Sequence, residues 1–162
     1  MKKITILLLS LFFVFSFMTV DVSAFDEDFA PYVINFSLTP DFDVYSTEGN
    51  ETRASGLISS YGLNLTKSGS TLTISGRTTG TVEVVRSGFK DLMVQRRKTS
   101  DDSWKDYYEY GNLYVDGFAA FLETNLEVAP NYQYRITCKH YAKKSLLVVQ
   151  TISNVSNIVT TV

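Results

Sequence analysis

Polar and apolar side chains alternate most regularly between residues 134 and 141. A period of two is that of a β-strand with one face in a core, and a helix would mix the two sets. The core-facing set comprises Tyr134, Ile136, Cys138 and His140. We therefore predict a long core strand here, preceded by a turn at Pro130 and Asn131, because proline offers no amide to a ladder.

A tyrosine stands at the start of this predicted strand, just after the turn. This placement resembles the tyrosine corner of immunoglobulin-like and fibronectin-like sandwiches, in which the ring packs inward and the hydroxyl binds backbone upstream. Tyr134 is our first assignment for that role. Tyr132 has the same parity and is the alternative.

The same period recurs from residue 57 onward. Leu63 and Leu65 precede a glycine-containing turn at residues 67–70, and Leu72 and Ile74 follow it, which predicts a hairpin with a bulge near Gly76. A second hairpin surrounds the polar turn at residues 99–103. About seven short strands without a helical stripe predict an all-β, immunoglobulin/fibronectin-like antiparallel two-sheet sandwich. A small up-and-down barrel is the alternative.

The first 24 residues have the pattern of a signal peptide. Lys2 and Lys3 precede an apolar run to Val20, and Ala24 offers a small residue to the peptidase. We predict cleavage after Ala24 and a secreted, extracellular product. The alternative is a retained membrane anchor, because the run approaches the length that spans a bilayer.

Residues 25–56 differ in composition from the rest and predict an acidic, partly flexible N-terminal segment before a sandwich domain at 57–162. The segment contains six aromatic residues, too many for a fully solvated tail, so we expect part of it to form an edge strand. They are Phe25, Phe29, Tyr32, Phe36, Phe42 and Tyr45.

The charge balance narrows the class of partner. Loss of residues 1–24 would remove Lys2, Lys3 and Asp21 and reduce 15 basic and 17 acidic residues to 13 and 16. A net charge of −3 argues against a nucleic-acid partner, which needs a basic surface. No stable membrane insertion is expected after cleavage. Cys138 is the only cysteine, so no intramolecular disulfide can form.

Candidate catalytic chemistry is sparse. Cys138 and His140 are the only thiol and imidazole, two apart on one strand face, but a working pair also needs contact and an orienting group. We expect Cys138 to be a buried, inert residue and His140 to lie near the rim. Asp101 and Asp102 share one turn, and the acidic residues at 26–28 share another. Neither group has the spacing of the ligands in a calcium loop. We predict no enzyme, no metal and no cofactor.

The second hairpin concentrates aromatic residues. Exposed aromatic faces stack on sugars or anchor protein partners. The hairpin therefore predicts a binding module for a glycan or a cell-surface protein. The alternative is a structural or self-associating envelope protein, since tyrosine is also a common strand residue. Strict alternation would place Tyr107 on the face opposite the other three. The candidate binding residues are Trp104, Tyr107, Tyr108 and Tyr110.

Three stretches in order resemble a family of small secreted proteins of Gram-positive bacteria known only as a domain of unknown function. They begin at Gly56, Leu92 and Tyr132 and read GLISSYGLNLTKSGSTLTISGRTTG, LMVQRRKTSDDSWKDYYEY and YQYRITCKHYAKKS. The family features fall on Trp104, Tyr134, Arg135, His140 and Ala142. The resemblance implies a fold and an export route, and no catalytic residues.

Overall fold

The computed structural model describes residues 29–40 and 52–162, so the predicted signal segment and the acidic residues at 26–28 lie outside the described part. The described residues form ten strands. They are β1 (Tyr32–Pro40), β2 (Thr52–Arg53), β3 (Ile58–Ser68), β4 (Thr71–Gly80), β5 (Arg86–Arg97), β6 (Lys105–Asp116), β7 (Ala119–Glu127), β8 (Gln133–Lys143), β9 (Val149–Val155) and β10 (Val159–Thr160).

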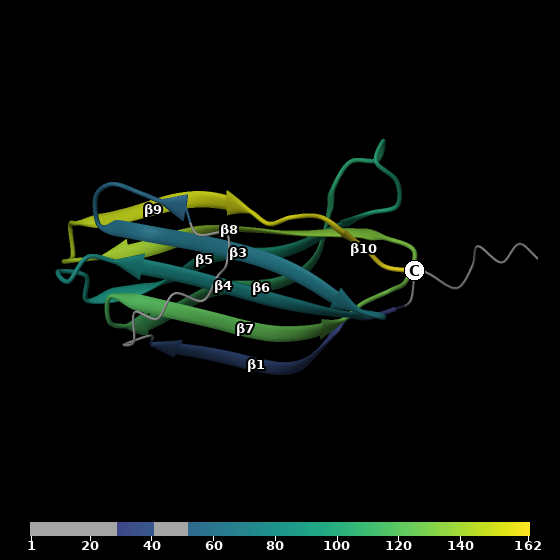
Figure 1. Ribbon diagram of the computed structural model, residues 1–162, viewed down its shortest axis with the longest axis horizontal. Coiled ribbons are helices and arrows are strands. Elements are labelled where there is room, and N and C mark those ends of the chain that lie inside the picture. Colours follow the sequence, from purple (N-terminus) through teal and green to yellow (C-terminus); the bar gives the residue numbers. More distant parts are fainter. Residues whose placement is uncertain (1–28, 41–51) are drawn as a thin grey trace, which may run out of the picture.

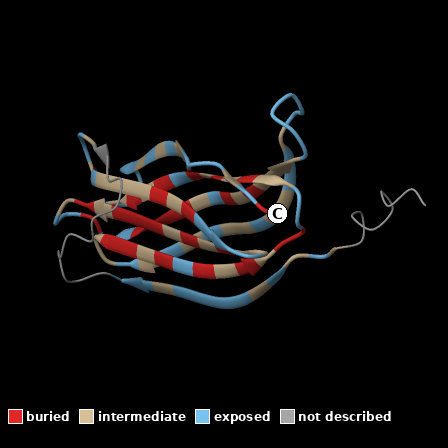
Figure 2. Cartoon of the chain, turned by 45° about the vertical axis from the view of Figure 1, so that its right-hand side comes forward, coloured by how far each residue is buried: buried red, intermediate tan, exposed pale blue. Residues whose placement is uncertain are grey.

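The strands form two antiparallel sheets that pack as a sandwich (Figure 1). The first sheet has the order β1-β7-β4-β3-β2. The second has the order β10-β8-β5-β6, with β9 also paired to β8. Buried residues alternate with more exposed ones along much of β3, β4, β7 and β8 (Figure 2), as expected where alternate side chains point into the space between two sheets. The predicted two-sheet sandwich is confirmed, and the sheets do not close into a barrel.

Strand β8 has the predicted core position. It pairs with β5 on one side and with β9 and β10 on the other. Asn131 in the preceding turn has φ 63°, a left-handed conformation in which asparagine is enriched. Tyr134 is fully buried, and its hydroxyl donates to the carbonyl of Ala129 at 2.8 Å. The predicted tyrosine corner is therefore confirmed at Tyr134.

Tyr134→Phe is expected to lower the free energy of unfolding by on the order of 1 kcal/mol, because a buried hydrogen bond is lost. The Ala129 carbonyl retains the Thr161 hydroxyl at 3.0 Å, which limits the cost. Urea unfolding measures the change. Tyr132→Phe is the matched control, since the Tyr132 hydroxyl makes no hydrogen bond to any described residue. Equal midpoints for Tyr134→Phe and the wild type would contradict the expectation.

The sandwich begins before residue 57, where we had placed its boundary. Strand β1, from the aromatic-rich N-terminal segment, pairs antiparallel with β7 and forms one edge of the first sheet. This is the edge strand that the aromatic residues led us to expect. Tyr32 and Phe36 remain about half exposed on it.

The predicted bulge at Gly76 is wrong. Strand β4 continues through this residue, which faces Leu63 on one side and Leu122 on the other in unbroken register. A Cβ added to Gly76 would lie 2.8 Å from the ring of Phe89. The glycine therefore makes room for an aromatic ring from the opposite sheet, an arrangement that is not visible along one strand.

Asn157, after β9, connects the two sheets. Its Oδ1 accepts a hydrogen bond from the Leu65 amide at 2.9 Å, and its Nδ2 donates to the Leu65 carbonyl at 2.7 Å. Both bonds join residues that are 92 positions apart. One amide side chain thus satisfies the outer backbone groups of β3 in the way that a neighbouring strand would.

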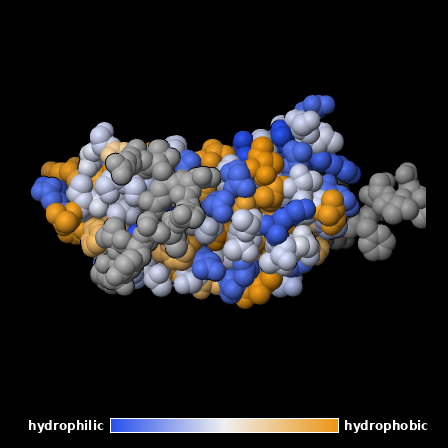
Figure 3. Space-filling model, viewed as in Figure 1, coloured by the Kyte–Doolittle hydropathy of each residue, from blue (hydrophilic) through white to orange (hydrophobic). Residues whose placement is uncertain are grey.

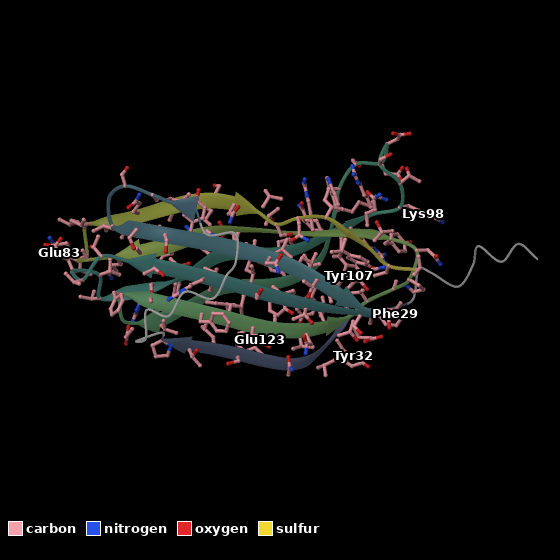
Figure 4. The ribbon with its side chains drawn as sticks, in the orientation of Figure 1. Phe29, Tyr32, Glu83, Lys98, Tyr107 and Glu123 are labelled. Carbon is pink, nitrogen blue, oxygen red and sulfur yellow. The ribbon has the colours of Figure 1, made fainter. Side chains whose placement is uncertain are left out.

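The two ends of the sandwich differ in character. Lys98 marks the end where the β5–β6 turn projects, and Glu83 marks the other (Figure 4). Exposed aliphatic side chains gather at the Glu83 end, at the left of Figure 3, and include Val82, Leu146 and Leu147. An ion pair of 2.7 Å between Lys144 and Glu83 joins the two loops that carry them. No helix among the described residues is both long and apolar enough to cross a membrane.

Candidate functional site

Strand β6 carries the predicted binding aromatics, and it is not a regular strand. Against β5, Val94 faces Tyr108 and Gln95 faces Asp106, which leaves Tyr107 as an extra residue. A second irregularity leaves Tyr110 extra in the same way. Each bulge shifts the side-chain parity of the strand by one residue. The strict alternation that we predicted for this hairpin is therefore wrong.

The three tyrosines of the hairpin all pack against the core. Tyr107 lies 5.5 Å from Tyr134 between ring centroids, and Tyr108 lies 4.9 Å from Tyr110. The Tyr110 hydroxyl is 3.2 Å from the hydroxyl of Thr124, and burial raises the pKa of Tyr110 to about 12. These partly buried rings help to hold β6 onto the sandwich.

Trp104 has a different environment. It is partly exposed and does not belong to the core cluster. The guanidinium carbons of Arg97 and Arg135 each lie 4.4 Å from the centroid of its ring, within the range of cation–π contacts. Arg135 alternates with the buried residues Tyr134 and Ile136, so the group lies on the outer face of the second sheet. We call Arg97, Trp104 and Arg135 the arginine–tryptophan cluster.

Glutamine side chains fix both arginines of this cluster. Arg97 Nε donates to Gln133 Oε1 at 2.8 Å, and its Nη1 donates to the carbonyl of Ser100 at 2.8 Å. Arg135 Nε donates to Gln95 Oε1 at 2.9 Å. The cluster is consequently held by hydrogen bonds to uncharged groups.

A third arginine lies on the inner side of the same corner. Arg96 has its guanidinium carbon 4.4 Å from the ring centroid of Tyr107 and 4.5 Å from that of Tyr132. Its Nη1 is buried and makes no hydrogen bond to any described residue. The hairpin end of the second sheet therefore combines three guanidinium groups with aromatic rings.

The arginines were not among the binding residues predicted from the sequence. The signal was present, because alternation places Arg97 and Arg135 on the face opposite the core. What was missing was the pairing of Gln95 with Arg135 and of Arg97 with Gln133, which brings the two arginines together across neighbouring strands. Of the four predicted aromatics, only Trp104 joins this cluster.

Cys138 and His140 do meet, at 3.8 Å between Sγ and Nε2. Our expectation that His140 lies near the rim is wrong, because it is fully buried between the rings of Tyr61 and Phe89. Cys138 is buried as expected, and burial raises its pKa to about 12. A thiol that is protonated and enclosed in this way does not present a nucleophile to a substrate.

The hydrogen bonds around His140 define its protonation. Thr78 Oγ1 donates to the Gly88 carbonyl at 2.9 Å, so it can only accept from His140 Nδ1, 2.7 Å away. His140 Nε2 then carries no proton and accepts from Asn154 Nδ2 at 3.2 Å. The ring is thus satisfied as neutral imidazole, and burial lowers its pKa to about 4.

The acidic turn of the hairpin is held by hydrogen bonds between its own residues. Asp102 Oδ2 accepts hydrogen bonds from the Thr99 amide at 2.8 Å and the Thr99 hydroxyl at 3.0 Å. These bonds lower the pKa of Asp102. Across residues 29–40 and 52–162, no group of three or more histidine, cysteine or acidic side chains is placed to hold a metal ion.

The arrangement with the clearest capacity for recognition is therefore the arginine–tryptophan cluster. Comparisons with known proteins found no match to a family model, a curated protein or a solved structure.

Proposed function

We propose that the protein is a non-catalytic binding module that works outside the cell and engages a glycan at the cell surface through the Trp104 end of the β5–β6 hairpin. The predicted signal peptide supports the location. The described part of the chain supports a binding role better than a catalytic one, since Cys138 and His140 are enclosed in the core.

One observation carries the proposal. Trp104 is the one aromatic residue of the four predicted that does not pack against the core cluster, and it directly follows the turn between β5 and β6. That turn projects from the sandwich (Figure 1). Arg97 and Arg135 hold its ring in place. A rigid aromatic ring loses little conformational entropy on binding, so it can contribute affinity from a shallow surface.

Replacement of Trp104 by alanine is expected to weaken binding to a glycan identified on an array by roughly fivefold or more, which corresponds to about 1 kcal/mol. Titration calorimetry of the purified protein measures the change. Tyr114→Ala is the matched control, because Tyr114 is an exposed aromatic at the other end of the same strand. Tyr108→Ala should instead reduce stability, because Tyr108 packs against the core.

Two results would count against the proposal. Unchanged glycan affinity in Trp104→Ala would separate this residue from binding. Loss of the β-rich circular dichroism spectrum in Trp104→Ala would show that the ring is structural, which would favour the alternative of a structural or self-associating envelope protein.

A further inference from the structure

We propose that the arginine–tryptophan cluster is an oxyanion-binding site and that the ligand of the module is an acidic polysaccharide. Arg97 and Arg135 would bind a carboxylate, sulfate or phosphate group, the oxyanions that guanidinium groups recognise in a bidentate manner. This inference rests on the proposed function and names the chemistry of its ligand.

The first argument is the absence of counter-ions at the cluster. Two basic side chains of the same sheet have acidic partners: Arg86 with Asp116 at 2.7 Å and Lys139 with Asp91 at 2.8 Å. Among the described residues, no carboxylate lies within ion-pairing distance of Arg97 or Arg135. Two positive charges therefore share one indole ring, and the Asp102 carboxylate in the adjoining turn acts on Arg97 only from beyond ion-pairing distance.

The two charges also affect each other. Burial and, after it, the charge of Arg97 lower the pKa of Arg135. Like charges that are held together by stacking and hydrogen bonding repel, and an anion bound between them removes that repulsion. The electrostatic potential at the arginine–tryptophan cluster therefore favours a negatively charged ligand.

The second argument is preorganisation. The bonds from Nε to Gln133 and to Gln95 set the planes of the two guanidinium groups. Arg135 retains both of its Nη groups without a hydrogen bond to any described residue, and Arg97 retains Nη2. These are the donors that form a two-pronged contact with an oxyanion. Because the side chains are already ordered, less entropy is lost on binding.

The third argument favours a polysaccharide over an acidic protein. The groups around the cluster are the amides of Gln95 and Gln133 and the carboxylate of Asp106, which accepts from Gln95 Nε2 at 2.8 Å. Amides and carboxylates on an outer sheet face suit the hydroxyl groups of sugars. A protein interface instead centres on desolvated apolar anchors. The strongly exposed aliphatic residues Val82, Leu146 and Leu147 lie at the opposite end.

The experiment compares a charged and a neutral glycan of the same backbone, together with a second acidic glycan and an acidic polypeptide. Dextran sulfate, neutral dextran, polygalacturonate and polyglutamate are titrated into the protein by calorimetry at two salt concentrations. We expect binding to dextran sulfate or polygalacturonate, weaker at high salt, and none to neutral dextran. Preference for one of the two acidic glycans then separates a sulfate-like from a carboxylate ligand.

Three variants locate the site. Arg97→Gln and Arg135→Gln should each weaken binding to the acidic glycan about tenfold, which corresponds to 1.4 kcal/mol. Arg86→Gln is the matched control: it removes the same charge from the same strand, about 35 Å away by strand rise, and should change the affinity less than twofold. Circular dichroism verifies that each variant keeps its fold.

The outcomes separate this inference from the proposed function. An equal loss in Arg86→Gln would show non-specific charge attraction and overturn the site. Tighter binding to polyglutamate than to either acidic glycan would overturn the ligand class. Binding to a neutral glycan that depends on Trp104 but on neither arginine would overturn the inference and leave the proposed function standing. If a glutamine variant unfolds, the corresponding lysine variant replaces it, because lysine keeps the charge but not the two-pronged contact and should still weaken binding.

Discussion

Gly88→Ala is expected to destabilise the protein by about 3 kcal/mol, because overpacking of this size forces the backbone to move. A Cβ at this position would lie 2.0 Å from the carbonyl oxygen of Leu113 in the neighbouring strand. Gly88 faces Tyr114 on one side and Tyr141 on the other, and these two rings approach to 4.6 Å between centroids. The Gly88 carbonyl also accepts a hydrogen bond from the Thr78 hydroxyl, and that hydroxyl in turn accepts one from His140.

Gly111→Ala provides the control within the same pair of strands. Gly111 has φ 75°, but an added Cβ meets nothing within 4 Å. Its replacement should cost only the left-handed strain of about 1 kcal/mol. Urea unfolding of both variants measures the difference. Equal midpoints for the two variants would mean that the close approach at Gly88 relaxes without cost.

Stability should fall as the pH is lowered from 7 to 5, by about 2 kcal/mol from His140 alone. Burial holds the pKa of His140 at about 4 in the folded protein, against 6.5 for the ordinary group. The unfolded chain therefore takes up a proton first, and each pH unit between these values favours unfolding. Above pH 6.5 both states hold neutral imidazole, so the contribution vanishes.

The dependence of stability on pH between 7 and 5 can be assigned to one residue, because His140 is the only histidine in the chain. In His140→Gln, the free energy of unfolding should change little between pH 7 and 5, although the variant is less stable throughout. Chemical unfolding at half-unit intervals of pH measures both curves. Parallel curves would show that other groups are responsible for the acid sensitivity.

The strands and the tyrosine corner could be predicted because both depend on short-range order. A period of two is visible within eight residues, and Pro130 and Asn131 mark the turn that places Tyr134. The bulges at Tyr107 and Tyr110 could not be predicted, since a bulge is defined by the residue count of the partner strand. The burial of His140 was missed for a related reason: its cover comes from Tyr61 and Phe89, in other strands.

The candidate site, too, could be predicted from the sequence only in part. Trp104 could be singled out from the sequence as the only tryptophan, beside a polar turn. Its two arginines are 38 positions apart in the chain (135 − 97) and become neighbours only through the register of β5 and β8. The sequence also could not show which aromatics the core would retain, because that choice depends on the two bulges.

The contact between Asn157 and Leu65 has a consequence for the order of folding. Closing a loop of 92 residues directly would cost about 4 kcal/mol of chain entropy, before any packing could offset it. Pairing of β3 with β4 and of β5 with β8 would shorten the loop that remains, so we expect the two residues to meet only after those strands are in register. Folding on the slow, millisecond-to-second timescale of non-local β topologies follows. We therefore expect the contact of Asn157 with β3 to form late, and until it forms the Leu65 amide and carbonyl that it binds are left to water.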